Sequence, residues 1–212
     1  MDKEKAYQTY IDYLLEVNAH TNLTAIIDIE EIKLKHFKDS LTVIDYINEG
    51  ERVLDIGAGP GFPGIPLRIE KDFDLTLIDS VNKKVKFMNE VIEKLDLDKA
   101  RAIHVRAEDY AKDKREGFDV VVSRAVANMA TLSEYALPFL KLGGTFVALK
   151  GPKAYEELEE AQNAIKVLGG EVDHIDEIDL DGNKRFNIIV KKVKKTKKMY
   201  PRGKNLPKKS PL

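Results

Sequence analysis

Cysteine is absent from this 212-residue chain, and so is tryptophan. Without cysteine the chain has no disulfides, thiolate metal sites or cysteine nucleophiles, which favours a reducing cytoplasm as its location. No apolar run approaches the roughly 18–20 residues that span a bilayer, and the first residues lack the apolar segment of a secretory signal. We therefore expect a cytoplasmic protein with no metal and no membrane partner, and we take it to be a monomer.

Acidic residues are absent from residues 191–212, which carry ten lysines or arginines. The rest of the chain is acidic overall, so the net charge of −1 hides this asymmetry. Such an end is either solvated or an arm that binds phosphate groups, and composition leaves both readings open. The candidate RNA contacts are Lys197, Lys198 and Arg202, together with Lys150 at a strand end. We expect residues 194–212 to form a basic tail without a packed element.

Residues 1–50 are expected to form an N-terminal helical cap. Helices are predicted at 6–18 and 30–48, with a polar connector at 22–24. In the second helix, apolar side chains recur every three or four positions, at Leu34, Phe37, Leu41 and Ile44. His36 and Ser40 lie four apart on a neighbouring face, with Asp39 alongside. These polar side chains either meet the substrate or pack the cap against the rest of the protein.

From residue 51 the chain alternates between short apolar runs and helical stretches. Apolar runs occur at 52–56, 75–79, 102–105, 118–123 and 145–150, and helical stretches at 65–70, 83–95, 129–140 and 155–168. Runs at 172–178 and 185–193 flank an Asp-Gly-Asn turn, which predicts a hairpin and an antiparallel last strand. Strands that alternate with helices form parallel βαβ units. Residues 51–193 are therefore expected to form an α/β, Rossmann-like domain with a mostly parallel seven-stranded sheet.

The most informative motif is a glycine loop after the first of these strands. Residues 53–64 (VLDIGAGPGFPG) carry a buried strand into closely spaced glycines, which let the backbone turn tightly and approach a ligand. The G-x-G-x-x-G pattern of nicotinamide cofactors needs glycine at position 62, where this chain has Phe62. Asp55 would repel a pyrophosphate, whereas S-adenosylmethionine (SAM) carries an ammonium group and a sulfonium that favour a carboxylate, directly or through water. The loop thus favours SAM, with S-adenosylhomocysteine as product and these candidate contacts: Asp55, Gly57, Gly59, Gly61 and Phe62.

Acids follow the next two strands as well. Asp79 ends the second strand, where a carboxylate can accept hydrogen bonds from both hydroxyls of an adenosine ribose. Ala107 and Glu108 follow the third strand, where an adenine ring would reach. At both places the alternative is an N-cap for the following helix.

Residues 55–67 (DIGAGPGFPGIPL) resemble the SAM loop of the ribosomal RNA small-subunit methyltransferase G family, RsmG, also called GidB. Further matches follow in the family's order, namely NLT at 22–24, HFKDSL at 36–41, SRA at 123–125, LKG at 149–151 and YPR at 200–202. The resemblance covers nearly the whole chain. It departs at Val17, where many relatives have tryptophan, and at 203–208 (GKNLPK), where the family commonly has Lys, a Gly-x-Pro step and Lys.

The resemblance implies a class I SAM-dependent methyltransferase that modifies N7 of one guanine in 16S (small-subunit) ribosomal RNA. Its expected partner is that RNA or the small ribosomal subunit. By motif, the SAM-contacting positions are Gly57, Phe62, Ala107, Glu108 and Arg124, and Asp79 matches the ribose acid. Recurrent polar positions are matched by His36, Asp39, Ser40, Lys150 and Arg202. Arg124, His36 and Asp39 are the candidate catalytic residues, and a structural ion pair is the alternative for Arg124.

Residue types that are missing narrow the reaction further. Methylation at C5 of a pyrimidine normally needs a cysteine nucleophile. Methylation of an exocyclic amine usually uses an Asn/Asp-Pro-Pro-aromatic turn, and residues 123–126 read SRAV instead. Guanine N7 fits what remains, because it carries an exposed lone pair and no proton. The rival hypotheses are an NAD(P) oxidoreductase, a SAM-binding ribosome-assembly module without turnover, and a small-molecule methyltransferase.

Overall fold

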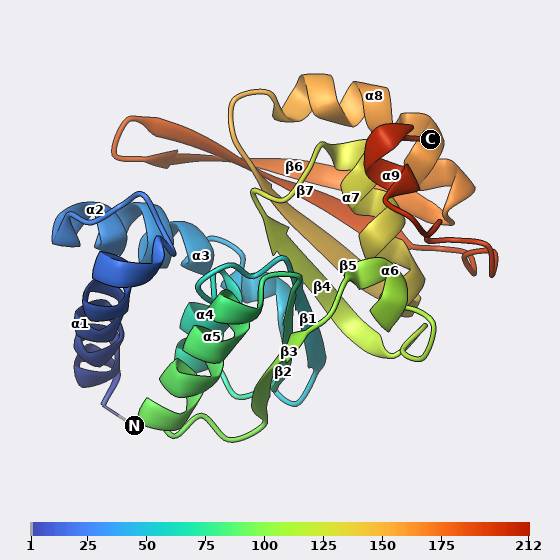
Figure 1. Cartoon of the computed structure of the whole chain (residues 1–212). Helices are drawn as coiled ribbons and strands as arrows, with labels where there is room; N and C mark the ends of the chain where they lie inside the picture. Colours follow the sequence, from blue (N-terminus) through green and yellow to red (C-terminus); the bar gives the residue numbers. More distant parts are fainter. Residues whose placement is uncertain (1) are drawn as a thin grey trace.

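Residues 2–212, which the computed structural model describes, form a seven-stranded sheet in the order β3-β2-β1-β4-β5-β7-β6 (Figure 1). The strands are β1 (Arg52–Ile56), β2 (Asp74–Asp79), β3 (Ala100–His104), β4 (Phe118–Arg124), β5 (Leu140–Lys150), β6 (Gly170–Leu180) and β7 (Asn183–Lys192). Neighbouring strands pair in parallel from β3 to β5, and β7 is antiparallel to both β5 and β6. The predicted α/β architecture with an antiparallel last strand is confirmed.

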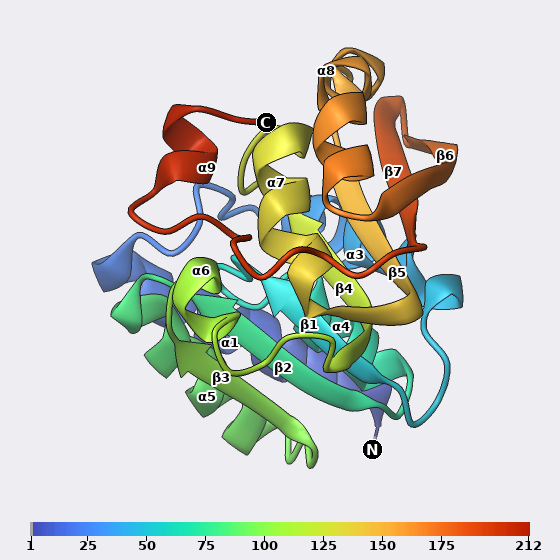
Figure 2. The same ribbon diagram turned by 90° about the vertical axis from the view of Figure 1, so that its right-hand side faces the viewer.

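Helices cover both faces of this sheet. One face packs against α1 (Lys3–Thr21), α4 (Gly64–Glu70) and α5 (Asn82–Lys94). The other packs against α6 (Ala107–Tyr110), α7 (Met129–Ala136), the 3₁₀ turn η3 (Leu137–Phe139) and α8 (Ala154–Val167), as the turned view shows (Figure 2). Because α1 shares its core cluster with the sheet, the predicted cap is packed directly onto the remainder of the protein.

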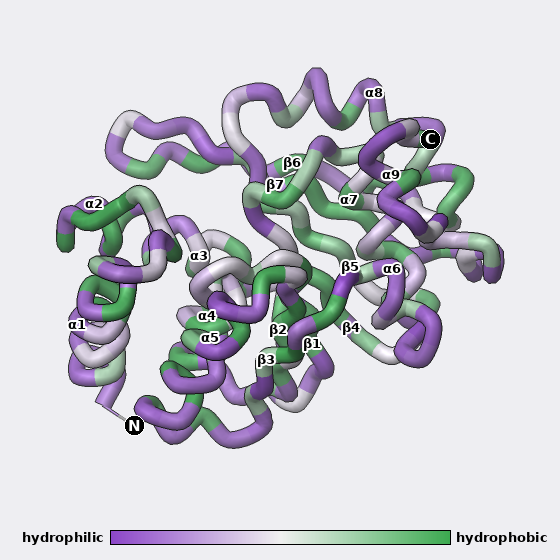
Figure 3. The backbone as a smooth tube through the Cα atoms, in the orientation of Figure 1, coloured by the Kyte–Doolittle hydropathy of each residue, from purple (hydrophilic) through white to green (hydrophobic). Residues whose placement is uncertain are grey.

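The central strands are apolar because both of their faces are covered. Val120, Val121 and Val122 are all buried, and they alternate between the two core clusters. Figure 3 shows this as hydrophobic backbone through the middle of the sheet, with hydrophilic segments around it. Fully burying a side chain of this size contributes roughly 1.5–3 kcal/mol. No helix in this described part of the chain combines the length and apolarity that crossing a membrane requires.

The helix predicted at residues 30–48 exists, but it ends at Leu41 and is not a regular α-helix. The segment consists of α2 (Ile29–Ile32), a π-helical stretch η1 (Lys33–Lys38), α3 (Asp39–Leu41) and a 3₁₀ turn η2 (Ile44–Tyr46). Within it, His36, Phe37, Asp39 and Ser40 are all buried, so polar and apolar side chains face the interior together. A π-helical turn of this kind is rare and frequently lies at a functional site.

The expectation of an unpacked tail is also wrong. Thr196, Tyr200 and Pro207 are buried, and the short helix α9 (Leu206–Lys209) packs against α7. The tail follows β7, whose last residue Lys192 has a buried ammonium that donates to the carbonyl oxygens of Leu137 and Leu168 at 2.7 and 3.3 Å. Burial lowers the pKa of Lys192 to about 8. The Lys192 ammonium can be buried because backbone carbonyl oxygens at two helix ends accept its hydrogen bonds. The positive charge of this segment therefore does not keep it in solvent.

Candidate cofactor and acceptor sites

The glycine loop lies where the strand order reverses, between β1 and β4, which is the usual ligand site of an open α/β sheet. Its amide groups at Gly57 and Ala58 donate to the carbonyl oxygen of Ile78, at 2.8 and 3.3 Å. Gly57 and Gly61 have φ angles of +69° and +105°, which favour glycine. The loop is therefore held against β2 in a backbone conformation that its sequence permits.

Alanine substitutions at two glycines of the loop should differ in their cost to stability, because Gly61 is tightly packed and Gly59 is not. A Cβ on Gly61 would lie 2.6 Å from the hydroxyl of Tyr10, whereas a Cβ on Gly59 would meet nothing within 4 Å. We expect Gly61→Ala to lower the free energy of unfolding by about 2–4 kcal/mol through strain and overpacking. Gly59→Ala, with φ of +61°, should cost only about 1 kcal/mol. Urea unfolding of both variants tests this, and equal losses would contradict the described packing.

A first cavity of about 430 Å³ opens beside this loop. Its lining comes from the ends of four strands, from α7 and from the tail, and includes Gly57, Asp79, Lys84, Arg106, Ala107, Glu108, Ala125, Val126, Ala127, Thr131, Tyr135, Asn205 and Lys208. Of the predicted cofactor contacts, the structure thus brings Gly57, Asp79, Ala107 and Glu108 together. The volume falls within the range of small-molecule sites, about 300–1,000 Å³.

Asp79 connects the loop to the first cavity. One carboxylate oxygen accepts a hydrogen bond from the Gly59 amide at 3.0 Å, and the other accepts one from the Val81 amide at 2.8 Å. Each oxygen of an ionised carboxylate has capacity for a further donor. Asp79 therefore supports the turn before α5 but is not the N-cap of that helix, which is Val81, and it still has acceptor capacity for a ligand.

Asp55 lies beneath the loop, outside the lining of the first cavity. Its Oδ2 accepts a hydrogen bond from the Gly64 amide at 2.8 Å, and no group within residues 2–212 donates to Oδ1. Burial raises the pKa of Asp55 to about 7, opposed by the Gly64 amide and the charge of Arg124. This geometry gives Asp55 a role in shaping the loop, and a direct contact with the cofactor stays a prediction.

Phe62 is also enclosed by protein. Its ring stacks on Tyr10 and His36, with centroids 5.3 and 4.4 Å apart, and the Arg124 guanidinium carbon lies 5.2 Å from its centroid. Phe62 thus joins the glycine loop to the π-helical segment. Phe62 does not line the first cavity, and its contact with the cofactor stays a prediction.

The second cavity measures about 620 Å³ and adjoins the first. Ala125, Val126 and Ala127, which follow β4, line both cavities. The rest of the lining comes from the cap, the ends of β4 and β5, α8 and β7, and includes Ile26, Lys35, His36, Asp39, Arg124, Lys150, Glu157, Arg185 and Asn187. Ala125 has a φ of +56°, a left-handed conformation that is uncommon for alanine and often marks functional sites.

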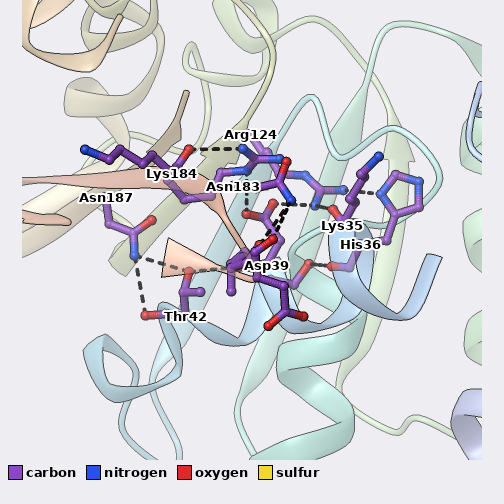
Figure 4. A network of polar contacts seen from close by, with 12 residues as sticks. Lys35, His36, Asp39, Thr42, Arg124, Asn183, Lys184 and Asn187 are labelled. Atoms are coloured by element: carbon purple, nitrogen blue, oxygen red, sulfur yellow. Dashed lines mark hydrogen bonds and ion pairs between the residues drawn. The ribbon is translucent and has the colours of Figure 1, made fainter. Parts of the chain in front are cut away.

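Arg124 is the centre of the polar network in this second cavity (Figure 4). Its guanidinium donates to Asp39 Oδ2 at 2.8 Å, to the Lys35 carbonyl oxygen at 3.0 Å and to His36 Nδ1 at 3.1 Å. Arg185 pairs with the other oxygen of Asp39 at 3.2 Å. The structure therefore brings the three candidate catalytic residues Arg124, His36 and Asp39 together, and it also contains the ion pair given as the alternative for Arg124.

The contacts of His36 fix its tautomer. Because arginine only donates, Nδ1 of His36 must accept from Arg124, so Nε2 carries the proton and donates to Thr24 Oγ1 at 3.0 Å. Burial, reinforced by the charge of Arg124, lowers the pKa of His36 to about 4. His36 is consequently neutral near pH 7 and holds Arg124 instead of serving as a proton donor.

Lys150 and Arg202 are engaged within the protein. The Lys150 ammonium donates to the Ala127 carbonyl oxygen and to Glu157, both at 2.6 Å, and so holds the border between the cavities. Arg202 pairs with the fully buried Glu134 at 2.6 Å. Lys197 and Lys198 are exposed. Of the four predicted RNA contacts, Lys197 and Lys198 are therefore the two whose exposure fits binding to RNA.

Several site residues had not been predicted from the sequence. They are Thr24, Glu134, Glu157, Arg185, Asn205 and Lys208. Thr24 lies in the NLT motif, so that motif was a usable signal. Glu157 follows its partner Lys150 by seven residues, whereas Glu134 and Arg185 are far in sequence from theirs. No local motif marks any of these residues.

The comparisons with known proteins agree with this geometry. The profile of the family described as rRNA small subunit methyltransferase G matches residues 3–198. Proteins named Ribosomal RNA small subunit methyltransferase G from Desulforamulus reducens and Lactobacillus johnsonii are 49% and 48% identical, over 98% and 99% of this chain and 89% and 92% of their own lengths. The structure of P. horikoshii TYW2 in complex with MeSAdo gives a TM-score of 0.61 at 18% identity, covering 74% of this chain and 62% of that one.

The sheet order and the position of the glycine loop, with these structural likenesses, define the class I SAM-dependent methyltransferase fold. Within that class, the chain belongs to the rRNA small subunit methyltransferase G family.

Proposed function

We propose that this protein transfers the methyl group of SAM to N7 of one guanine in small-subunit ribosomal RNA, in the cytoplasm. The observation that carries the proposal is the shared border of the two cavities at residues 125–127. A donor in the first cavity and a base in the second would meet across this border. Membership of the rRNA small subunit methyltransferase G family supports the choice of RNA as acceptor.

The lining of the first cavity fits SAM. Asp79 offers acceptor capacity for the ribose hydroxyls, and Ala107 and Glu108 lie where the adenine would reach. When bound, SAM supplies a methyl group on a positively charged sulfur. The loop does not suit a dinucleotide, because the Asp55 carboxylate lies directly beneath it and Phe62 occupies the place of the third glycine.

The second cavity can hold the target guanine in position, and several of its charged side chains are paired with one another. It supplies no general base. His36 is neutral with its Nδ1 occupied, and the charge of Arg124 is paired with Asp39. Guanine N7 needs no deprotonation, so holding it in line with the donor is the main requirement. Effective molarities for well-oriented reactants are worth roughly 7–11 kcal/mol. Both oxygens of Asp39 are already paired, with Arg124 and Arg185, so this cluster acts by holding groups in position.

A pH profile should reflect this arrangement. We expect the single-turnover rate to be flat from about pH 6 to about pH 8, because no group must lose a proton for transfer to N7.

The folded-state pKa of His36, about 4, lies below its ordinary value of 6.5. The unfolded chain therefore binds more protons at His36 between these values, so the contribution of His36 to stability falls as the pH drops through that window, while the raised pKa of Asp55 contributes in the opposite direction. His36→Gln should weaken this acid sensitivity, whereas a rate that rises tenfold per pH unit near neutrality would indicate a general base.

The proposal is tested by incubating the protein with labelled SAM and undermethylated small-subunit ribosomal RNA, then mapping the label. We expect one labelled guanine, with the methyl group on N7. Label on another base or another atom would contradict the proposed acceptor. SAM binding without any transfer would instead support a ribosome-assembly module.

A further inference from the structure

Part of the tail borders the first cavity. Asn205 and Lys208 are among its lining residues, together with Thr131 and Tyr135 of α7. Figure 2 shows α9 beside α7, above α6. Because the tail folds back along α7, it forms part of the wall of the proposed cofactor cavity.

The position of this segment is fixed by a buried acid. Glu134 on α7 accepts hydrogen bonds from the Arg202 backbone amide at 2.7 Å and from its guanidinium at 2.6–3.2 Å. Arg202 also donates to the carbonyl oxygen of Ser210 at 2.9 Å, which closes residues 202–210 into a loop. Thr131 donates to the carbonyl oxygen of Pro207 at 2.8 Å. Asn205 and Lys208 both lie within this loop, so these contacts fix their positions.

The loop shares the first cavity with Ala107 and Glu108, which begin α6. Tyr135 follows Thr131 by one helical turn on the same face of α7, and both line this cavity. Thr131 contacts the tail, and α7 contacts α6. The tail and α6 are therefore two walls of one cavity, both in contact with α7.

We propose that Asn205 recognises the adenine edge of the cofactor, with Lys208 closing the cavity above it and Arg202–Glu134 as the positioning pair. The inference rests on the proposed function, which puts the adenine beside Ala107 and Glu108. An asparagine amide pairs with adenine by donating to a ring nitrogen and accepting from the exocyclic amine. Asn205 has a left-handed backbone, with φ of +60°, and its side chain is half-buried at the cavity wall.

The variant Asn205→Gly removes the amide and keeps the left-handed backbone. Lys204→Gly is its matched control, because Lys204 has a φ of +57° and does not line the cavity. Calorimetry with S-adenosylhomocysteine and with S-inosylhomocysteine, whose 6-amino group is replaced by oxygen, measures recognition of the adenine edge. We expect the wild type to prefer the adenine compound by at least tenfold, and Asn205→Gly to lose most of that preference through weaker binding of the adenine compound.

Arg202→Gln tests the positioning pair. Alone it should weaken binding of S-adenosylhomocysteine about as much as Asn205→Gly does, and the double variant should be no weaker than either single one. Additive losses would show that Arg202 affects binding independently of Asn205 and would contradict its positioning role. An unchanged adenine preference in Asn205→Gly would overturn the inference while leaving the proposed function intact. A wild type that binds no S-adenosylhomocysteine would contradict both.

Discussion

Replacing Arg124 with methionine is expected to lower the single-turnover methylation rate by about 10²–10³-fold, as removal of one preorganised donor typically does. Arg124 holds Asp39 and His36 in the second cavity, and both carboxylate and guanidinium are largely buried. SAM affinity should change much less, because Arg124 lines the second cavity and not the first. Rapid-quench measurement of transfer, with calorimetry for SAM, separates the two effects.

Arg124→Lys is the matched control. Lysine keeps the charge but lacks the planar fork that bonds Asp39, His36 and the Lys35 carbonyl oxygen at once. We expect it to recover stability more than rate. If Arg124→Met transfers methyl groups at the wild-type rate, Arg124 is only a structural partner of Asp39 and the second cavity is not the acceptor site.

The second large effect is expected at Asp79. Asp79→Ala should weaken SAM binding by about 10- to 150-fold, the equivalent of roughly 1.5–3 kcal/mol for hydrogen bonds to a charged group. It removes acceptors for the ribose and also frees the Gly59 amide, so the loop loses a support. Asp79→Asn keeps one acceptor oxygen and should lose less. Calorimetry at matched folded fractions measures both variants.

Asp109→Ala serves as the control for Asp79. Asp109 is an exposed carboxylate that pairs with Lys112 on the surface and does not line the first cavity. Its removal should leave SAM affinity unchanged. Equal affinities for the wild type and a folded Asp79→Ala variant would exclude Asp79 from the cofactor site.

Local patterns were sufficient for the sheet and the loop. The strand at 52–56 was predicted to the residue, and the turn at 181–183 identified the hairpin, because each depends on sequence-local periodicity or turn chemistry. Asp79 and Glu108 could be predicted to approach each other because the carboxyl ends of parallel strands meet at one edge of a sheet.

The remaining features depend on partners far away in sequence. The π-helical segment buries His36 and Asp39 because Arg124, more than eighty residues later, offers them hydrogen bonds. The tail packs because Arg202 finds Glu134, 68 residues earlier, in an otherwise apolar helix face. An acid such as Glu134 inside a largely apolar stretch is a signal for a cationic partner, whereas the composition of the tail alone predicts a solvated segment.

The central claim is that the two cavities meeting at residues 125–127 hold the cofactor and the target base. A crystal structure with S-adenosylhomocysteine tests it most directly. The account predicts that the ribose hydroxyls bind Asp79 and that the sulfur faces residues 125–127, toward the cavity lined by Arg124. S-adenosylhomocysteine bound elsewhere, or bound with its sulfur directed away from that border, would contradict the account.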